Sequence, residues 1–191
     1  FKEINKIGIK NKIPIIEDGA QSFGSTHHNF KSCGLSTIGT TSFFPSKPLG
    51  GYGDGGACFT NNKELANKMR ILSLHGQEKR YSHIKIGLNG RLDTIQAAIL
   101  LAKLEVFEEE ISARQIIGKR YNDEFQKLGF MYTPKISKCN TSVYAQYTIQ
   151  IENRNKIIQK LKEINIPTAI HYPSLITNQK AFNKNRSFFR N

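Results

Sequence analysis

Two short apolar segments, each followed by a polar loop, constrain the fold of this chain most strongly. Residues 13–17 form a nearly continuous apolar run that ends in the acids Glu17 and Asp18. Such a run is typical of a strand buried on both faces of a parallel sheet. Further strands are predicted over residues 39–44 and 56–60. Because helical patterns precede and follow these strands, we expect an α/β fold.

Outside these strands, most of residues 1–128 show helical periodicity. Residues 2–12 read as the end of an amphipathic helix. Asn61 or Asn62 can cap a helix over residues 63–74, which Gly76 is placed to end. Residues 81–91 are polar and irregular. A long helical pattern then starts at Asp93, a plausible N-cap, and continues with room for a kink to residue 128.

The strand-helix rhythm is lost near residue 120, which predicts a domain boundary there. Apolar residues alternate over 143–151, a pattern that indicates a half-buried strand of an antiparallel sheet. Asn153 or Asn155 could cap a helix over 156–164, and residues 168–172 could form a last strand. We therefore expect one domain over residues 1–119 and a small, incomplete C-terminal α/β domain over residues 120–191.

Composition restricts the function classes. The 191 residues, 38% of them hydrophobic, suffice for one large domain or two small ones. No stretch approaches the roughly 18 apolar residues of a membrane-spanning helix, so no membrane partner is expected. Three scattered cysteines without a CxxC pair or a Cys/His cluster favour a reducing cytoplasm and predict no metal site. The chain opens inside a helical pattern without Met, so a piece of a longer protein is expected.

The net charge of +13 taken alone would suggest a nucleic-acid-binding module. The basic residues are spread along the chain, however, and mixed with Asn and Ile. We expect them to attract a phosphorylated substrate and do not predict a nucleic-acid partner. Salt-sensitive binding to duplex DNA would support the alternative.

The residues that indicate a chemical function lie around Lys47, in a loop rich in Ser and Gly after the second predicted strand. A strand-end acid and a loop lysine suit pyridoxal 5'-phosphate (PLP). The acid, Asp18, would keep the pyridine nitrogen protonated, and the lysine amine would form a Schiff base. The alternative is a solvated loop lysine. The glycines of residues 50–56 lack the ending of a phosphate-binding P-loop, so we interpret them as close backbone packing.

Five motifs in order carry a resemblance to a known family: EDGAQSFG at 17–24, TSFFPSKPLG at 41–50, YGDGG at 52–56, LHGQ at 74–77 and GLNGRLD at 87–93. The chain resembles the DegT/StrS group of PLP-dependent nucleotide-sugar aminotransferases. The resemblance implies the fold type I of PLP-dependent transferases, with the central part of a mostly parallel large-domain sheet. The family's N-terminal phosphate turn and its ring-stacking aromatic have no counterpart here.

The resemblance also implies roles for individual residues. Lys47 would be catalytic, forming the internal Schiff base and moving the proton. Asp18 would pair with the ring nitrogen, and strand geometry by itself points the adjacent Glu17 to the opposite face. Gln21 would lie against the ring, Ser42 would donate to the phosphate, and Asn89 would reach the phosphate of the neighbouring subunit's cofactor. A homodimer with a shared active site follows from the last role.

Substrate contacts are expected from four further residues: His75, Arg91, His171 and Tyr172. The segment IPTAIHYP at 166–173 resembles members of the family that aminate UDP-linked 3-keto uronate sugars. The implied reaction moves an amino group, with glutamate as donor, onto a keto nucleotide sugar for lipopolysaccharide O-antigen or another surface polysaccharide.

Other readings remain open at this point. A PLP-dependent sugar dehydratase shares the fold, but such relatives carry His where Lys47 stands. An inactive fragment or a regulator-like member would also preserve the motifs.

Overall fold

The computed structural model describes residues 1–182 and divides into two compact units, with the division after Ile149. Each unit is described separately below. The prediction placed the boundary between residues 119 and 120, which here lie inside a continuous helix. Residues 183–191 of the predicted small domain lie outside the described residues.

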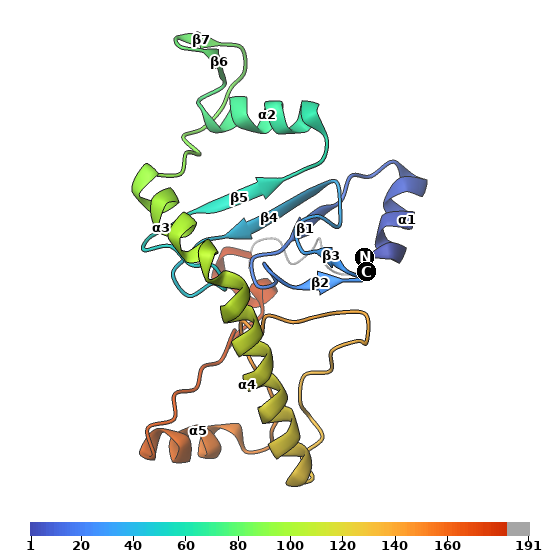
Figure 1. Cartoon of the computed structure of the whole chain (residues 1–191), viewed down its shortest axis with the longest axis vertical. Helices are drawn as coiled ribbons and strands as arrows, with labels where there is room; N and C mark the ends of the chain where they lie inside the picture. Colours follow the sequence, from blue (N-terminus) through green and yellow to red (C-terminus); the bar gives the residue numbers. More distant parts are fainter. Residues whose placement is uncertain (183–191) are drawn as a thin grey trace. The chain divides into compact units, whose positions relative to one another are not determined.

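A three-stranded sheet forms the centre of the first unit (Figure 1). Its strands are β1 (Ile16–Asp18), β4 (Ile38–Ser42) and β5 (Gly56–Phe59), in the order β1-β4-β5. Strands β1 and β4 run parallel, and β5 runs antiparallel to β4. The three predicted strands are therefore confirmed, although β1 begins later along the chain than residue 13.

Four helices follow the predicted periodicity closely. They are α1 (Lys2–Asn11), α2 (Lys63–Ser73), α3 (Thr94–Glu105) and α4 (Phe107–Lys127). Asn62 caps α2, where its side chain accepts a hydrogen bond from the Leu65 amide at 3.0 Å. Gly76, with φ of 74°, follows the end of α2. The expected interruption of the long helix is the break between α3 and α4 at Val106.

The first predicted strand is less buried than its sequence suggests. Ile13 and Ile16 are 61% and 67% exposed, whereas Glu17 is 3% exposed. Within residues 1–182, β1 pairs only with β4 and is an edge strand. The expectation that this segment is buried on both faces is therefore wrong for this chain.

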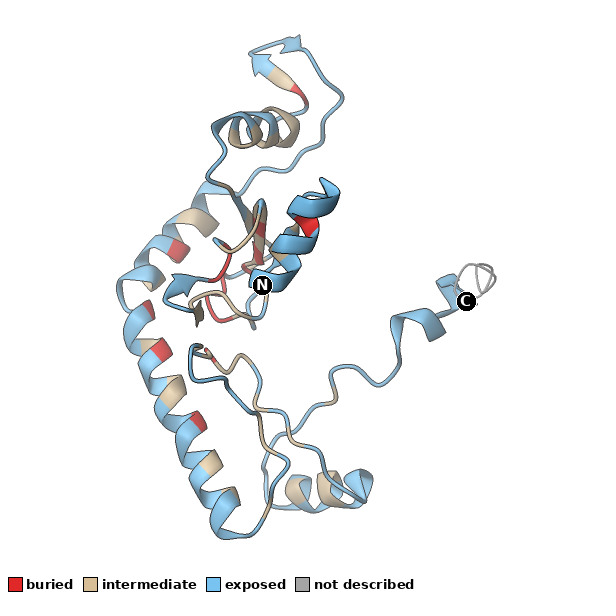
Figure 2. Cartoon of the chain, turned by 90° about the vertical axis from the view of Figure 1, so that its right-hand side faces the viewer, coloured by how far each residue is buried: buried red, intermediate tan, exposed pale blue. Residues whose placement is uncertain are grey.

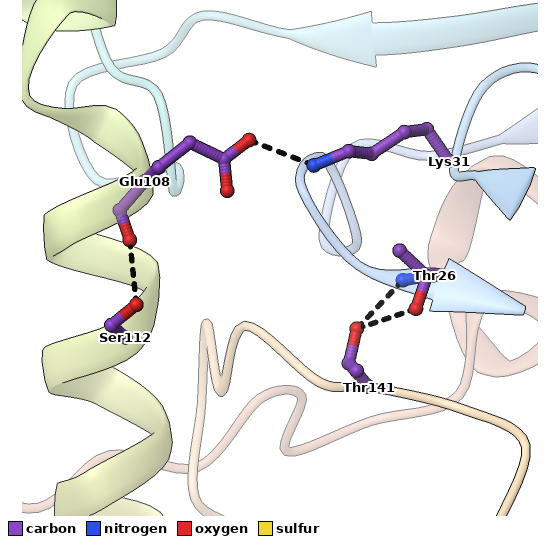
Figure 3. A network of polar contacts seen from close by, with 5 residues as sticks. All are labelled: Thr26, Lys31, Glu108, Ser112 and Thr141. Carbon is purple, nitrogen blue, oxygen red and sulfur yellow. Dashed lines mark hydrogen bonds and ion pairs between the residues drawn. The ribbon is translucent and has the colours of Figure 1, made fainter. Parts of the chain in front are cut away.

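Two short hairpins were not predicted. The first joins β2 (Thr26–His27) to β3 (Phe30–Lys31), and the second joins β6 (Gln77–Lys79) to β7 (Ser82–His83). Figure 3 shows how the first hairpin is tied to its surroundings. The Thr26 amide and hydroxyl both lie 2.9 Å from the Thr141 hydroxyl, and the Lys31 ammonium lies 2.7 Å from a carboxylate oxygen of Glu108 on α4.

The hydrophobic core lies between the sheet and the α3–α4 segment. Phe23 packs edge-on against Phe43 and stacks on Phe59 and Phe107. Figure 2 shows buried positions gathered at the sheet and recurring along α4, while the β6–β7 hairpin is mostly exposed. The buried cluster consists of Phe43, Leu49, Leu100, Phe107, Ile111 and Val143. It holds the loop after β4 against α3.

The predicted strands of the C-terminal part do not form within residues 1–182. Over 143–149 the odd-numbered residues are more buried than Gln146 and Thr148, as the alternation predicted, but no strand pairs with them. An alternating pattern determines which side chains face inward, whereas a strand also needs a ladder partner. Residues 168–172 also form no strand. The predicted helix is confirmed as α5 (Arg154–Glu163) with Asn153 at its N-cap, and a 3-10 turn, η1 (Ile176–Asn178), follows.

No helix within residues 1–182 combines the length and the apolar character needed to cross a membrane.

Candidate active site

The loop that carries Lys47 is closed at its base by backbone hydrogen bonds. The Gly51 amide donates to the Phe43 carbonyl at 2.8 Å, and the Phe43 amide donates to the Gly55 carbonyl at 2.8 Å. Lys47 lies midway between Phe43 and Gly51, where its own amide donates to the Phe44 carbonyl at 2.9 Å. Its side chain is half-buried, and Leu49 beside it is 3% exposed. The loop therefore presents Lys47 from a fixed base.

The glycine run after Lys47 reflects close backbone packing. A Cβ on Gly50 would lie 2.4 Å from the Pro45 carbonyl oxygen, and one on Gly56 would lie 2.7 Å from the Thr41 carbonyl oxygen. Real Cβ atoms do not approach backbone oxygens so closely, so any side chain here would displace the loop. The interpretation of these glycines as packing residues is confirmed.

Two side chains of α3, neither singled out from the sequence, hold the same loop. The amide oxygen of Gln96 accepts a hydrogen bond from the Tyr52 amide at 2.8 Å. The ammonium of Lys103 donates to the Gly50 carbonyl at 2.6 Å. Gln96, Leu100 and Lys103 follow the i, i+4, i+7 spacing of one helix face. This spacing could have indicated that the three residues share a helix face. It does not indicate which loop they contact, because the partners lie more than forty residues away in the sequence.

Asp18 and Ser42 lie on one face of the sheet at one edge. Asp18 is in register with Thr40, and Ser42 lies two residues further along β4, about 7 Å at standard strand spacing. Because β1 and β4 are parallel, both residues lie at the carboxyl ends of their strands. One oxygen of Asp18 accepts from the Ala20 amide at 3.0 Å, and the Ser42 hydroxyl oxygen accepts from the Phe44 amide at 3.2 Å.

Glu17 faces the opposite side of the sheet from Asp18, as predicted. Its buried carboxylate accepts hydrogen bonds from the Cys33 amide at 2.7 Å, the Leu35 amide at 3.0 Å and the Ser32 hydroxyl at 3.2 Å. These three donors replace the water that a buried carboxylate loses. Burial raises the pKa of the neighbouring Cys33 thiol, and the carboxylate of Glu17 adds to the effect. Glu17 thus fixes the loop over residues 32–35, and Asp18 lies on the other face of the sheet.

Gln21 lies in the turn that immediately follows β1. The Gly19 amide donates to the Thr40 carbonyl at 2.7 Å and extends the β1–β4 ladder by one residue. The amides of Ser22 and Phe23 both donate to the Gly19 carbonyl at 3.0 Å and close the turn. The exposed Gln21 is therefore near the sheet edge that carries Asp18.

His75, Asn89 and Arg91 form a second, separate group. The His75 amide donates to the Leu88 carbonyl at 3.0 Å, and the side-chain oxygen of Asn89 accepts from the Arg91 guanidinium at 2.9 Å. All three residues are exposed. Within residues 1–182 no hydrogen bond or ion pair joins this group to Asp18, Ser42 or Lys47. The chain thus brings together part of the predicted site and presents the rest outward.

The two remaining predicted residues, His171 and Tyr172, belong to the second unit. Both are exposed, and their rings meet edge to face with centroids 5.5 Å apart. Their predicted role in substrate contact stays a prediction.

The polar groups at the carboxyl ends of β1 and β4 suit a phosphorylated, aldehyde-bearing cofactor such as PLP. The Lys47 ammonium and the second oxygen of Asp18 have no hydrogen-bond partner among the described residues, so both can take one from a ligand. Ser42 retains its hydroxyl hydrogen as a donor because its oxygen is the acceptor for Phe44. A reactive amine, a carboxylate and a hydroxyl donor on adjacent elements are the groups that such a cofactor needs.

Two cavities lie away from this group of residues. One of about 660 Å³ is lined in part by Cys33, Phe59, Met69 and Arg70, and one of about 460 Å³ lies along α4 beside Tyr121 and Phe125. Neither is lined by a predicted site residue. Within residues 1–182 no three His, Cys, Asp or Glu side chains gather as metal ligands would.

Comparisons with known proteins identify the family of the chain. The sequence profile of the DegT/DnrJ/EryC1/StrS aminotransferase family matches residues 1–189. The UDP-2-acetamido-2-deoxy-3-oxo-D-glucuronate aminotransferase of Pseudomonas aeruginosa is 54% identical over 95% of this chain and 50% of its own length. The chain spans about half the length of the curated relatives it matches.

Two solved structures extend the comparison. A DegT DnrJ EryC1 StrS aminotransferase from Brucella abortus has a TM-score of 0.91 and 42% identity, over 95% of this chain and 48% of its own. NtdA from Bacillus subtilis, solved with bound cofactor PMP, has a TM-score of 0.77 and 30% identity, over 94% and 42%.

Proposed function

The chain belongs to the DegT/DnrJ/EryC1/StrS aminotransferase family, and from this premise we propose that it carries the PLP-binding part of a nucleotide-sugar aminotransferase. One observation carries the proposal. Lys47 lies on a closed loop that leaves β4 at the same sheet edge where Asp18 ends the neighbouring parallel strand. The fold type I arrangement of PLP-dependent transferases is part of the proposal.

Lys47 is the proposed catalytic base and acid. In the first half-reaction its amine would take the proton from the α-carbon of the amino donor and pass it to the bound cofactor, and in the second it would move a proton from the cofactor to the sugar carbon that becomes aminated. When bound, PLP supplies the aldehyde that carries the amino group and a ring that accepts electrons. The position of Lys47 on a loop with a hydrogen-bonded base favours this role, because the loop presents the amine from a constant place.

The neighbouring polar residues are proposed to hold the cofactor. Asp18, with one oxygen fixed by Ala20, would turn its other oxygen toward the ring nitrogen and keep that nitrogen protonated. Ser42 would donate its hydroxyl hydrogen to the phosphate, and Gln21 would lie against the ring.

The proposed substrate is a UDP-linked 3-keto uronate sugar, with glutamate as the amino donor. The 54% identity to the Pseudomonas aeruginosa enzyme supports this class. His75, Arg91, His171 and Tyr172 are the proposed substrate contacts, Arg91 because a guanidinium can pair with a carboxylate or phosphate. The product would be used for a surface polysaccharide such as O-antigen. The three free thiols favour a cytoplasmic location for the reaction.

We also propose that a second copy of the chain completes the site. Asn89 and Arg91 lie among exposed apolar residues, with Ile86 98%, Leu88 62% and Ile95 75% exposed. Exposed apolar groups around polar ones are typical of a protein interface. Asn89 would cross that interface to the phosphate of the partner's cofactor.

A half-reaction tests the proposed function. The purified protein is incubated with PLP and L-glutamate, and 2-oxoglutarate and pyridoxamine phosphate are measured by mass spectrometry. We expect both products from the wild type and from Lys68→Ala, an exposed lysine on α2, and neither from Lys47→Ala. Retained turnover in Lys47→Ala would contradict the proposed role.

Mixing two inactive variants tests the shared site. If Lys47 and Asn89 act in one site across a dimer, co-refolded Lys47→Ala and Asn89→Ala chains regain one intact site in each mixed dimer. Random pairing then restores about a quarter of wild-type activity. Activity no higher than that of the two separate variants would indicate that both residues serve the same subunit.

A further inference from the structure

We propose that Gln96 and Lys103 of α3 are positioning residues that set the place of Lys47. The inference rests on the proposed function, because it concerns the lysine expected to do the chemistry. Among the described residues, no hydrogen bond joins either side chain to Lys47. Both hold the backbone of the loop that carries it.

The Gln96 side chain reaches the part of the loop after Lys47. Its amide oxygen accepts the Tyr52 N–H, so this donor determines which end of the amide faces the loop. A Cβ on Gly51 would lie 2.8 Å from that oxygen, and one on Gly53 would lie 2.9 Å from the amide nitrogen. The two glycines thus make room for the Gln96 amide, which lies against the loop backbone on both sides of Tyr52.

Lys103 binds the loop closer to Lys47. Its ammonium donates to the Gly50 carbonyl at 2.6 Å and lies 5.8 Å from the centroid of the Tyr52 ring. Hydrogen bonds from a charged donor are stronger than neutral ones. Lys103 is half-buried, so little water competes for the carbonyl. The contact fixes Gly50, whose neighbour Gly51 closes the loop onto Phe43.

Leu100 supplies the apolar part of the same contact. It lies between Gln96 and Lys103 on one face of α3 and packs in the cluster with Phe43 and Leu49, which flank Lys47. Apolar contact of this kind resists separation of helix and loop, whereas the two directional hydrogen bonds determine where along the helix the loop sits. Removing either bond should therefore leave the fold intact while the loop gains freedom.

Hydrogen exchange of the 191-residue chain tests the inference without the cofactor. In Gln96→Leu and Lys103→Met we expect amides of residues 47–53 to exchange roughly fivefold to tenfold faster, as the loss of one hydrogen bond implies. Gln96→Glu keeps an acceptor oxygen and should stay within about twofold of the wild type. Matched controls are Gln126→Leu on α4 and Lys68→Met on α2, both at exposed positions. Unchanged exchange in Gln96→Leu and Lys103→Met would overturn the inference.

A second measurement connects the loop to Lys47. Each variant is treated with PLP and borohydride, and the rate of labelling at Lys47 is compared with that at Lys68 by peptide mapping. We expect the Lys47:Lys68 ratio to fall about tenfold in Gln96→Leu and to recover in Gln96→Glu. A ratio unchanged in Gln96→Leu, with faster exchange, would show that the loop is anchored without positioning Lys47. If the wild type is not labelled at Lys47, the proposed function fails, and hydrogen exchange alone still decides whether α3 fixes the loop.

Discussion

The loop over residues 43–55 and the segment over residues 75–91 both carry predicted site residues, yet they are built differently. The first is fixed by core packing, by two side chains of α3 and by its own backbone hydrogen bonds. The second is joined to the end of α2 through backbone contacts such as Leu88 to Leu72 at 2.9 Å, and residues 78–95 are all exposed. The chain thus anchors the Lys47 loop through contacts of its own, whereas the side chains of Asn89 and Arg91 are exposed.

The largest expected effect comes from the core under the Lys47 loop. Leu100→Ala removes a side chain that is 5% exposed and packed in the cluster with Phe43 and Leu49. It should lower the free energy of unfolding by about 2–5 kcal/mol, measured by urea denaturation. The matched control Leu101→Ala, at a position 65% exposed, should cost less than about 1 kcal/mol. Equal losses would show that this helix face is not buried against the loop.

An intermediate effect is expected where the second segment leaves α2. Gly76 has φ of 74°, and a Cβ there would lie 1.7 Å from the Lys85 carbonyl oxygen. Gly76→Ala should therefore cost about 1–3 kcal/mol and release the amides of residues 75–91 to hydrogen exchange. Gly129 has a similar φ of 71° but nothing within 4 Å. Gly129→Ala should cost about 1 kcal/mol, and an equal cost at the two glycines would show that the close approach is absent.

The reactivities of two thiols, one buried and one exposed, test how firmly the loop beside β1 is closed. Cys33 is buried, and burial raises its pKa, whereas Cys58 is exposed. Alkylation by iodoacetamide at pH 8 should be at least about tenfold slower at Cys33 than at Cys58, measured by mass spectrometry. Similar rates at the two thiols would show that the loop under β1 opens freely.

The raised pKa of Cys33 also determines the sign of a pH effect. The folded chain favours the neutral thiol, so its contribution to stability is fully present below the pKa of an unfolded thiol, about 8.5. That contribution is lost as pH rises through the higher folded pKa. In the wild type the free energy of unfolding should therefore decrease as pH rises above 8, and in Cys33→Ala this decrease should be smaller. An unchanged decrease would contradict the raised pKa of Cys33.

The smallest effect is expected in the exposed segment. Within residues 1–182 the side chain of Asn89 hydrogen-bonds to Arg91, two residues away. Asn89→Ala should change the free energy of unfolding by no more than about 0.5 kcal/mol. Asn62→Ala, which removes the same side chain from the N-cap of α2, should cost about 1 kcal/mol. A larger loss at Asn89 would mean that this segment supports the fold itself.

Local sequence patterns predicted the elements whose causes are local. The Asn62 cap and the opposite facing of Glu17 and Asp18 follow from periodicity and end signals. A kink in the long helix was allowed for, but its position at Val106 was not predicted. The alternation over 143–149 also predicted which side chains turn inward. It could not provide a partner strand, because pairing depends on residues distant in sequence.

The supports of the site were harder to foresee. Gln96 and Lys103 meet the Lys47 loop across 44 and 53 residues, and a Gln or a Lys on a helix gives no sign of such a partner. Lys47 was singled out because the residue types around it, together with the acid at the end of β1, suit a cofactor-binding loop. The role proposed for Asn89 depends on a second chain, and the roles proposed for His171 and Tyr172 stay predictions.

The most direct test of the account is the position of a trapped cofactor. The protein is incubated with PLP, reduced with borohydride, digested and mapped by mass spectrometry. We predict one dominant pyridoxyl label on Lys47, which the Lys47→Ala substitution abolishes. A label spread over exposed lysines such as Lys68, with none in excess on Lys47, would contradict it.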